Sequence, residues 1–92
     1  MGKYYVTTPI YYVNDVPHIG TAYPTVAADV VARFHRMTGD EVLFSTGTDE
    51  NATKVARVAL QQGEDPKAFV DKMAARFEDT WHRMNITYDA FI

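Results

Sequence analysis

Extended and helical patterns alternate along this chain, and the alternation limits the folds that are open to it. β-branched and aromatic residues fill two short runs, residues 3–8 and 41–45, each of a length typical of one strand. Apolar residues recur with helical spacing in three segments, residues 19–37, 52–62 and 66–84. The last five residues again have the composition of a strand. Such alternation is typical of a parallel sheet with right-handed crossovers, so the sequence predicts an α/β fold with a three-stranded parallel sheet and crossover helices.

The first predicted helix has one wide apolar face. Its members are Ile19, Ala22, Tyr23, Val26, Ala27, Val30, Val31, Phe34 and Met37. A Thr-Gly-Asp sequence at residues 38–40 ends the periodic pattern, as expected at the end of a helix.

A parallel sheet needs cover on both faces, and three short strands make only half of a doubly wound sheet. The chain is therefore predicted to be the first half of a larger nucleotide-binding domain.

The third predicted helix begins with a strong start signal, an Asp65 cap followed by Pro66 at the first helical position. Its apolar stripe is predicted to form the core and consists of Phe69, Val70, Met73, Phe77, Trp81 and Met84. His35 and His82 lie on polar faces of their helices, where we expect them to be solvated.

The composition excludes several classes of protein. Ninety-two residues with 47% apolar side chains fit one globular domain. A net charge of −3 provides no basic surface for nucleic acid, so any such surface would lie elsewhere. Without cysteine there is neither a disulfide nor a thiolate metal site. The first residues lack the apolar core of a signal peptide and no apolar run approaches a membrane span, which predicts a cytoplasmic location.

Polar side chains follow the first two predicted strands. Residues 10–17 are predicted to be a loop and residues 46–51 a turn, because Asn, Asp, Pro and Gly interrupt them. Both segments leave the carboxyl ends of parallel strands, the edge where open α/β sheets bind ligands. The polar or aromatic residues there are Tyr11, Tyr12, Asn14, Asp15, His18, Thr46, Thr48, Asp49 and Glu50.

The helix entrance at Gly20-Thr21 is predicted to face phosphate. Backbone N–H groups at a helix N-terminus attract anions, and Gly20 allows a close approach. His18 can donate to phosphate oxygens as charge builds in a transition state, and Asp49 suits an ammonium group. Each residue also has a purely structural interpretation. His18 could be a helix-entry residue, Gly20 a turn glycine and Asp49 part of a helix cap, and the tyrosines could be packing residues.

Several motifs resemble one family. HIGT at residues 18–21 resembles the HIGH signature of class I aminoacyl-tRNA synthetases. The longer motifs TPIYYVNDVPHIG and FSTGTDE are more specific, and with the terminal NITYDAFI they resemble the amino terminus of bacterial-type methionyl-tRNA synthetases. The resemblance covers essentially the whole chain.

The resemblance implies that residues 1–92 are the N-terminal half of a Rossmann-like class I catalytic domain. It implies ATP, with Mg²⁺, as substrate, and two steps: methionine forms methionyl-adenylate, and the aminoacyl group then passes to tRNA. The tRNA would be bound through domains that this chain does not include, and the resemblance implies no metal site and no membrane partner here. The site residues implied are His18 and Thr21 for catalysis; Asn14, His18, Gly20 and Thr21 for ATP; and Pro9, Ile10, Tyr12 and Asp49 for methionine.

The sequence departs from the family pattern in four respects. Thr21 stands where these enzymes usually carry a second histidine, and Asn51-Ala52 stands where they usually have His-Gly. Pro24 would remove a backbone donor if it lies beyond the first helical turn. No KMSKS-like loop is present, so we expect a fragment with little activity of its own. The alternative is a stand-alone nucleotide or amino-acid binding module without ligase activity.

Overall fold

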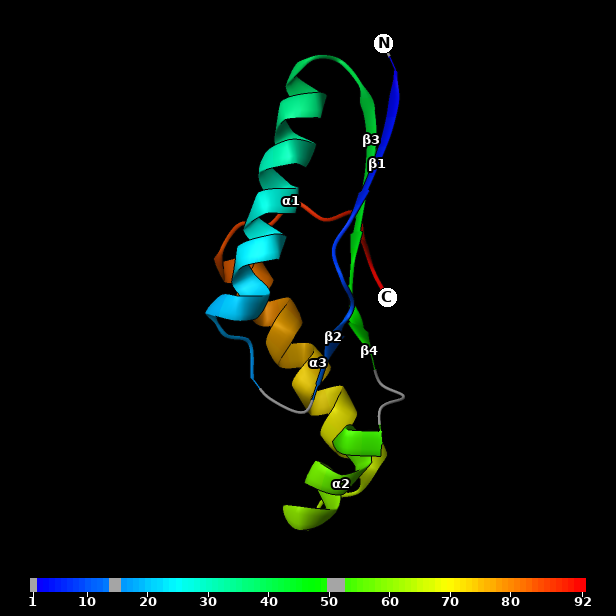
Figure 1. The fold of residues 1–92 in the computed structure, drawn as a ribbon, viewed down its shortest axis with the longest axis vertical. Coiled ribbons are helices and arrows are strands. Elements are labelled where there is room, and N and C mark those ends of the chain that lie inside the picture. The colour runs from blue at the N-terminus through cyan, green and yellow to red at the C-terminus, as the bar shows by residue number, and fades with distance from the viewer. Residues whose placement is uncertain (1, 14–15, 50–52) are drawn as a thin grey trace.

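The computed structural model describes residues 2–13, 16–49 and 53–92. Its elements, in chain order, are β1 (Lys3–Thr7), β2 (Tyr11–Tyr12), α1 (Ile19–Met37), β3 (Glu41–Thr46), β4 (Thr48–Asp49), α2 (Thr53–Gln61), α3 (Pro66–Arg83) and β5 (Ala90–Phe91) (Figure 1). Among the described residues, no helix is both long and apolar enough to cross a membrane.

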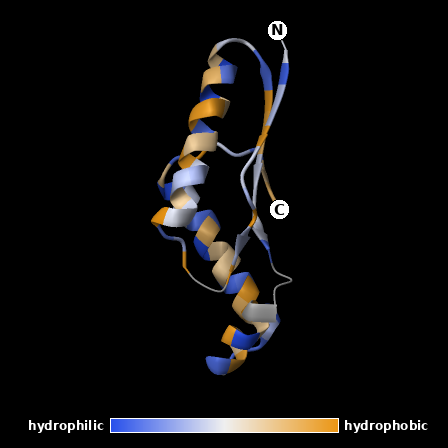
Figure 2. Cartoon of the chain, viewed as in Figure 1, coloured by the Kyte–Doolittle hydropathy of each residue, from blue (hydrophilic) through white to orange (hydrophobic). Residues whose placement is uncertain are grey.

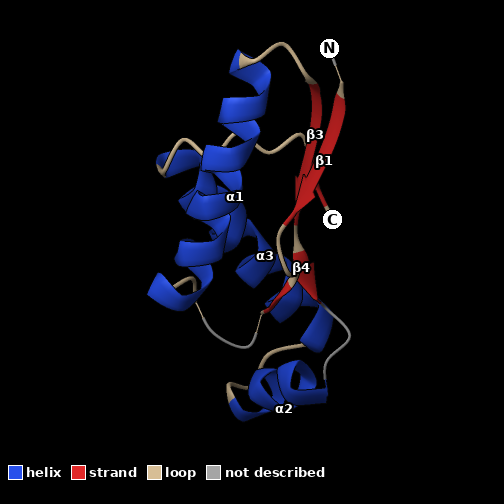
Figure 3. Cartoon of the chain, turned by 45° about the horizontal axis from the view of Figure 1, so that its top comes forward, coloured by secondary structure: helices blue, strands red, loops and turns tan. Residues whose placement is uncertain are grey.

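The main sheet has the strand order β1-β3-β5, and both of its pairings are parallel. Residues 3–7 pair in register with residues 41–45, and β5 pairs with the carboxyl end of β3. Helix α1 connects β1 to β3, while α2 and α3 connect β3 to β5. Both α1 and α3 lie on the same side of this sheet in the two views (Figures 1 and 3). The predicted α/β fold with a three-stranded parallel sheet is thus confirmed.

A second, two-stranded parallel sheet continues beyond the first and was not predicted. Tyr11 pairs with Thr48, and Tyr12 pairs with Asp49. The prediction of a loop at residues 10–17 and a turn at residues 46–51 is therefore wrong for these four residues. A strand of two residues is too short to show alternation in sequence. It forms because β1 and β3 enter it already paired, with the Tyr11 amide donating to the Gly47 carbonyl at 3.1 Å.

Gly47 separates β3 from β4 and allows a close backbone approach. A Cβ atom at this position would collide with the carbonyl oxygen of Ile92. The end of the chain bonds on both sides of this glycine, because Ile92 donates to the Thr46 carbonyl at 2.9 Å and accepts from the Thr48 amide at 3.1 Å. A residue without a side chain is therefore required where the two sheets meet.

The core lies between α3 and the strands. Five of the six predicted stripe residues of α3 are buried, namely Phe69, Val70, Met73, Phe77 and Trp81, while Met84 is exposed. The ring of Tyr11 stacks on Phe77 at 6.0 Å between centroids and meets Trp81 edge-on at 6.3 Å. These contacts anchor β2 on the buried face of α3 through Tyr11.

Helix α1 turns its wide apolar face away from the core. Its buried residues are Thr25, Ala28, Asp29 and Ala32, whereas Ile19, Tyr23, Val30, Phe34 and Met37 are each more than half exposed. Small side chains at 28 and 32 let the helix approach the sheet closely. Figure 2 shows that apolar residues lie along α1 as well as along α3. The Cα radius of gyration is 14.8 Å, against about 12 Å for a compact domain of this length, which agrees with the large apolar area left uncovered.

His35 differs from its prediction as a solvated side chain. Its ring is half-buried and stacks on Tyr4 with 3.6 Å between centroids, and its Nδ1 lies 2.7 Å from Oδ2 of Asp40. Asp40 also accepts from the Gly2 amide at 3.0 Å. The hydrogen bond with His35, and to a lesser extent that from Gly2, hold the pKa of Asp40 below its ordinary value. His82 is exposed as predicted, although its Nε2 lies 3.2 Å from the Tyr88 hydroxyl. The histidine of α1 therefore anchors the amino terminus.

Asp29 joins α1 to the segment that precedes β5. Its Oδ1 accepts from the amide and the hydroxyl of Thr87 at 2.8 and 2.5 Å, and its Oδ2 accepts from Nε of Arg33 at 2.8 Å. Arg36 donates to the hydroxyl and carbonyl of Thr87 at 2.6 and 2.9 Å. Burial raises the pKa of the Asp29 carboxyl, but the hydrogen bonds from Thr87 and Arg33 outweigh it and hold that pKa below the ordinary value.

The fold should therefore lose stability in acid through Asp29. A carboxylate with a lowered folded-state pKa stabilises the fold above its unfolded pKa, here 3.8, and that stability is lost as the pH falls through the folded value. Below about pH 4, we expect the midpoint of thermal unfolding to fall more steeply for the unmodified chain than for Asp29→Asn. Asp79→Asn, at an exposed carboxylate on α3, is the matched control and should retain the steep fall. Parallel profiles for the unmodified chain and Asp29→Asn would refute this role.

Candidate functional site

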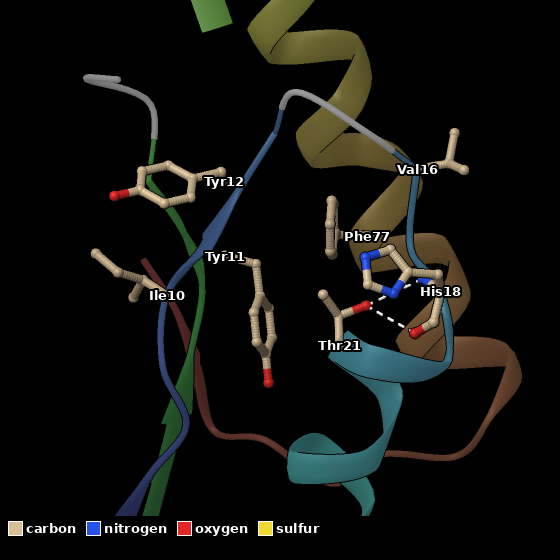
Figure 4. A pocket seen from close by; sticks show the side chains of 7 residues that line it. All are labelled: Ile10, Tyr11, Tyr12, Val16, His18, Thr21 and Phe77. Atoms are coloured by element: carbon tan, nitrogen blue, oxygen red, sulfur yellow. Dashed lines mark hydrogen bonds between the residues drawn. The ribbon is translucent and has the colours of Figure 1, made fainter. Parts of the chain in front are cut away.

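The candidate site lies where β1 and β3 end. Because these strands are parallel, the segments that follow them leave at the same edge of the sheet. A cavity of about 220 Å³ lies there between β2 and the start of α1 (Figure 4). Its lining residues are Ile10, Tyr11, Tyr12, Val16, His18, Thr21 and Phe77. The cavity thus combines aromatic and aliphatic walls with a histidine and a hydroxyl.

His18 is the N-cap of α1. Its backbone is extended, with φ −144° and ψ −179°, and its Nδ1 accepts from the Gly20 amide at 3.0 Å. The hydroxyl of Thr21 accepts from the His18 amide at 3.0 Å and donates to the His18 carbonyl at 2.9 Å. Together these bonds form a capping box, so the helix-entry interpretation of His18 describes its local structure. The helix begins at Ile19, where the apolar periodicity predicts that it begins.

The cap decides which nitrogen of the His18 ring carries the proton. A neutral imidazole has one donor and one acceptor nitrogen. Since Nδ1 accepts from the Gly20 amide, the neutral ring carries its proton on Nε2. The ring lines the cavity, where Nε2–H can donate to an oxygen of a ligand (Figure 4). The helix-entry role and the predicted phosphate-contact role therefore use different ring atoms and are compatible.

Gly20 leaves room for this ring. A Cβ atom built on Gly20 would lie 2.8 Å from Cε1 and 3.0 Å from Nδ1 of His18. The imidazole rests over the first turn of α1 only because residue 20 has no side chain. The space beside Gly20, which was predicted to allow a close approach of a ligand, is therefore filled by the His18 ring.

The residues predicted to bind methionine gather around β2 and β4. Paired residues of parallel strands project to the same face, so Tyr12 and Asp49 share one face of the small sheet, while Tyr11 and Thr48 share the other. Tyr11 and Thr48 are buried, whereas Tyr12 is exposed and Asp49 is partly exposed. Figure 4 shows Ile10 and Tyr12 on one side of β2 and Tyr11 on the other.

Other predicted residues have different outcomes. Pro9 is exposed and lies between β1 and β2. Asn14, Asp15, Glu50 and the family departures at Asn51 and Ala52 lie outside the described residues. Pro24 lies beyond the first turn of α1, so the Gly20 carbonyl lacks the amide that would normally bond to it.

Sequence reasoning missed Val16 and Phe77 as lining residues and Thr25 altogether. Phe77 was assigned to the core, and its burial is confirmed, but it also forms a wall of the cavity. Thr25 is fully buried beside Tyr11 and carries no signal in the apolar periodicity of its helix. Within residues 2–13, 16–49 and 53–92, no group of three or more His, Asp or Glu side chains is placed to hold a metal ion.

Comparison with known proteins identifies the family. Residues 4–92 match the family model described as tRNA synthetases class I (M). The chain belongs to this family. A methionine–tRNA ligase of Thermotoga maritima is 52% identical over 98% of the chain, and that of Rickettsia prowazekii is 56% identical over 97%. The chain spans only 14% and 18% of the length of these two class I synthetases.

The fold agrees with that of a solved class I synthetase. The structure of Mycobacterium tuberculosis methionyl-tRNA synthetase in complex with methionyl-adenylate matches the whole chain with a TM-score of 0.98 and 42% identity. The match covers 18% of that synthetase chain. The similarity therefore includes the segments around β2, β4 and the start of α1 as well as the main sheet.

The hydrogen bond between Gly20 and His18 predicts which tautomer the neutral ring of this histidine adopts. In ¹⁵N NMR spectra at pH 8, we expect His18 to show the Nε2–H tautomer. Gly20→Ala should displace the ring, because the new Cβ would meet Cε1 at 2.8 Å, and should lower the Nε2–H fraction of His18 to that of an unconstrained histidine. Gly2→Ala, at the opposite end of the sheet, is the control and should leave the His18 signals unchanged, because its new Cβ would make only an ordinary contact with Oδ1 of Asp40 at 3.4 Å. An Nδ1–H ring in the unmodified chain would disprove the assignment.

Proposed function

We propose that this chain is the N-terminal half of a class I catalytic domain that activates methionine with ATP and transfers it to tRNA. One observation carries the proposal: the whole chain matches, with a TM-score of 0.98, a synthetase whose structure contains methionyl-adenylate. A histidine at the N-cap of α1 and a carboxylate on β4 at the same sheet edge support it. The chain alone is expected to have little ligase activity, since the relatives are several times longer.

The start of α1 is proposed to bind ATP. Backbone N–H groups and the helix dipole favour phosphate at a helix N-terminus. His18 would donate from Nε2 to the α-phosphate as negative charge builds during the attack, which stabilises the transition state. Thr21 would act by holding the His18 backbone, because its hydroxyl is already used in the cap. Asn14 remains a predicted ATP ligand, and Mg²⁺ would arrive with the phosphates of ATP.

The small sheet is proposed to bind methionine. The Asp49 carboxylate would pair with the ammonium group of the substrate, a charge-assisted interaction. Pro9, Ile10 and Tyr12 would wall the apolar thioether side chain. With both substrates held, the methionine carboxylate attacks the α-phosphate and pyrophosphate leaves, and the enzyme acts mainly by positioning and electrostatics. The tRNA would be bound by segments outside this chain.

The second candidate function is a binding module without ligase activity. Two observations favour it: the Thr21 hydroxyl is used for capping, and Pro24 removes a bond from the first turn of α1. Methionine-dependent exchange of pyrophosphate into ATP separates the two candidates. Exchange by the chain at high concentration supports the catalytic proposal, whereas tight binding of a methionyl-adenylate analogue without exchange supports the binding module.

Calorimetry with a non-hydrolysable methionyl-adenylate analogue tests the site. The analogue should bind more tightly than methionine or ATP, because it spans both parts of the site. Asp49→Asn should weaken methionine and the analogue by about tenfold or more and leave ATP unchanged, since only the former carry the ammonium group. Asp71→Asn, at an exposed carboxylate on α3, should change none of them. Absence of heat with the analogue, or equal losses for ATP and methionine in Asp49→Asn, would contradict the assignment.

A further inference from the structure

A buried hydrogen-bond chain connects β2 to the first turn of α1. The Tyr11 hydroxyl lies 2.8 Å from Oγ1 of Thr25, and that Oγ1 lies 2.8 Å from the Thr21 carbonyl oxygen. Thr25 is fully buried and Tyr11 is buried. The two bonds cross from the strand of the proposed methionine site to the helix of the proposed ATP site.

Counting protons gives the direction of this chain. A carbonyl oxygen can only accept, so the single hydroxyl proton of Thr25 goes to the Thr21 carbonyl. Tyr11 must therefore donate to Thr25. The hydroxyl of Thr21 in turn bonds to the amide and carbonyl of His18. Two sets of hydrogen bonds, joined by the covalent structure of Thr21, thus lead from Tyr11 to the backbone of His18.

Pro24 increases the importance of these bonds. It has no N–H to donate to the Gly20 carbonyl, so the first turn of α1 lacks one of its ordinary hydrogen bonds. The Thr25 hydroxyl adds a bond at the next carbonyl, that of Thr21. In this sequence, the start of α1 is held from the side by Thr25 and Tyr11 where the helix itself is weakened.

The Tyr11 end of this hydrogen-bond chain is anchored in the core. The Tyr11 ring packs on Phe77 and Trp81, and its amide bonds to Gly47 at 3.1 Å. The next residue along β2 is Tyr12, which pairs with Asp49 on the opposite face. Tyr11 is therefore fixed to the same strand pair that carries the proposed methionine ligands.

We propose that Tyr11 and Thr25 are positioning residues that fix the spacing between the Tyr12–Asp49 pair and the His18–Thr21 turn. This inference rests on the proposed function, because it assumes that one ligand spans both parts. Methionine alone would contact only the β2–β4 part. The loss of either hydroxyl should therefore weaken a ligand that spans the site more than it weakens methionine.

Tyr11→Phe and Thr25→Val delete the hydroxyls and keep the side-chain shapes. Each should weaken the methionyl-adenylate analogue by about 3- to 10-fold and methionine by less than about twofold, as expected for the loss of one hydrogen bond in Tyr11→Phe and of two in Thr25→Val. The double variant should lose no more than Thr25→Val, because that substitution already removes the hydrogen bond that Tyr11→Phe removes. Thr25→Ser should restore binding. Tyr5→Phe is the control. It removes a hydroxyl of β1 that bonds to Ser45 on β3, and it should bind the analogue and methionine like the unmodified chain.

Hydrogen exchange in the ligand-free chain tests the inference separately from the proposed function. Tyr11→Phe and Thr25→Val should raise the exchange rate of the Gly20 amide by about 3- to 10-fold, and Thr25→Ser should not. Unchanged Gly20 exchange in Tyr11→Phe would overturn the inference whether or not a ligand binds, as would equal weakening of methionine and the analogue. Failure of the unmodified chain to bind the analogue would instead overturn the proposed function, and the Gly20 exchange rates would still decide the positioning role.

Discussion

The parallel pairing of β1 with β3 is the constraint on which the rest of the structure depends. Because the two strands run side by side in register from residues 3 and 41, they end together, and the chain leaves both at one edge. Pro9 follows the first strand and Gly47 the second, and the strands resume as β2 and β4. A crossover helix must return to the opposite end of the sheet, so α1 begins at this same edge. His18 and Asp49, far apart in sequence, come to the same edge for this reason.

The sequence was sufficient for the elements that depend on local periodicity. Alternating patterns predicted the three-stranded parallel sheet, and the stripe of α3 predicted most of the core. The small sheet could not be predicted, since its strands of two residues show no alternation and form because β1 and β3 enter them already paired. Nor could the exposure of the apolar face of α1, because the helix approaches the sheet through Ala28 and Ala32, and close approach is a property of two elements together.

Side-chain hydrogen bonds limited what could be predicted about the site. Sequence reasoning left His18 between a helix entry and a phosphate contact, and the structure shows that Nδ1 serves the cap. The roles of Thr25 and Asp29 had no sequence signal. Each is a polar residue on a helix whose partner, Tyr11 or Thr87, lies 14 or 58 positions away. Polar burial of this kind follows from the packed fold and cannot be derived from the period of one helix.

The convergence of the two strand ends on one ligand is tested most directly by amide chemical shifts. Addition of a non-hydrolysable methionyl-adenylate analogue to the ¹⁵N-labelled chain should shift the amides of Gly20 and Thr21 at the start of α1. The same addition should shift Thr48 and Asp49 on β4, while Lys3 and Glu41 at the opposite end of the sheet stay unchanged. Shifts confined to one of the two segments, or centred on Lys3 and Glu41, would contradict a single site built from both strand ends.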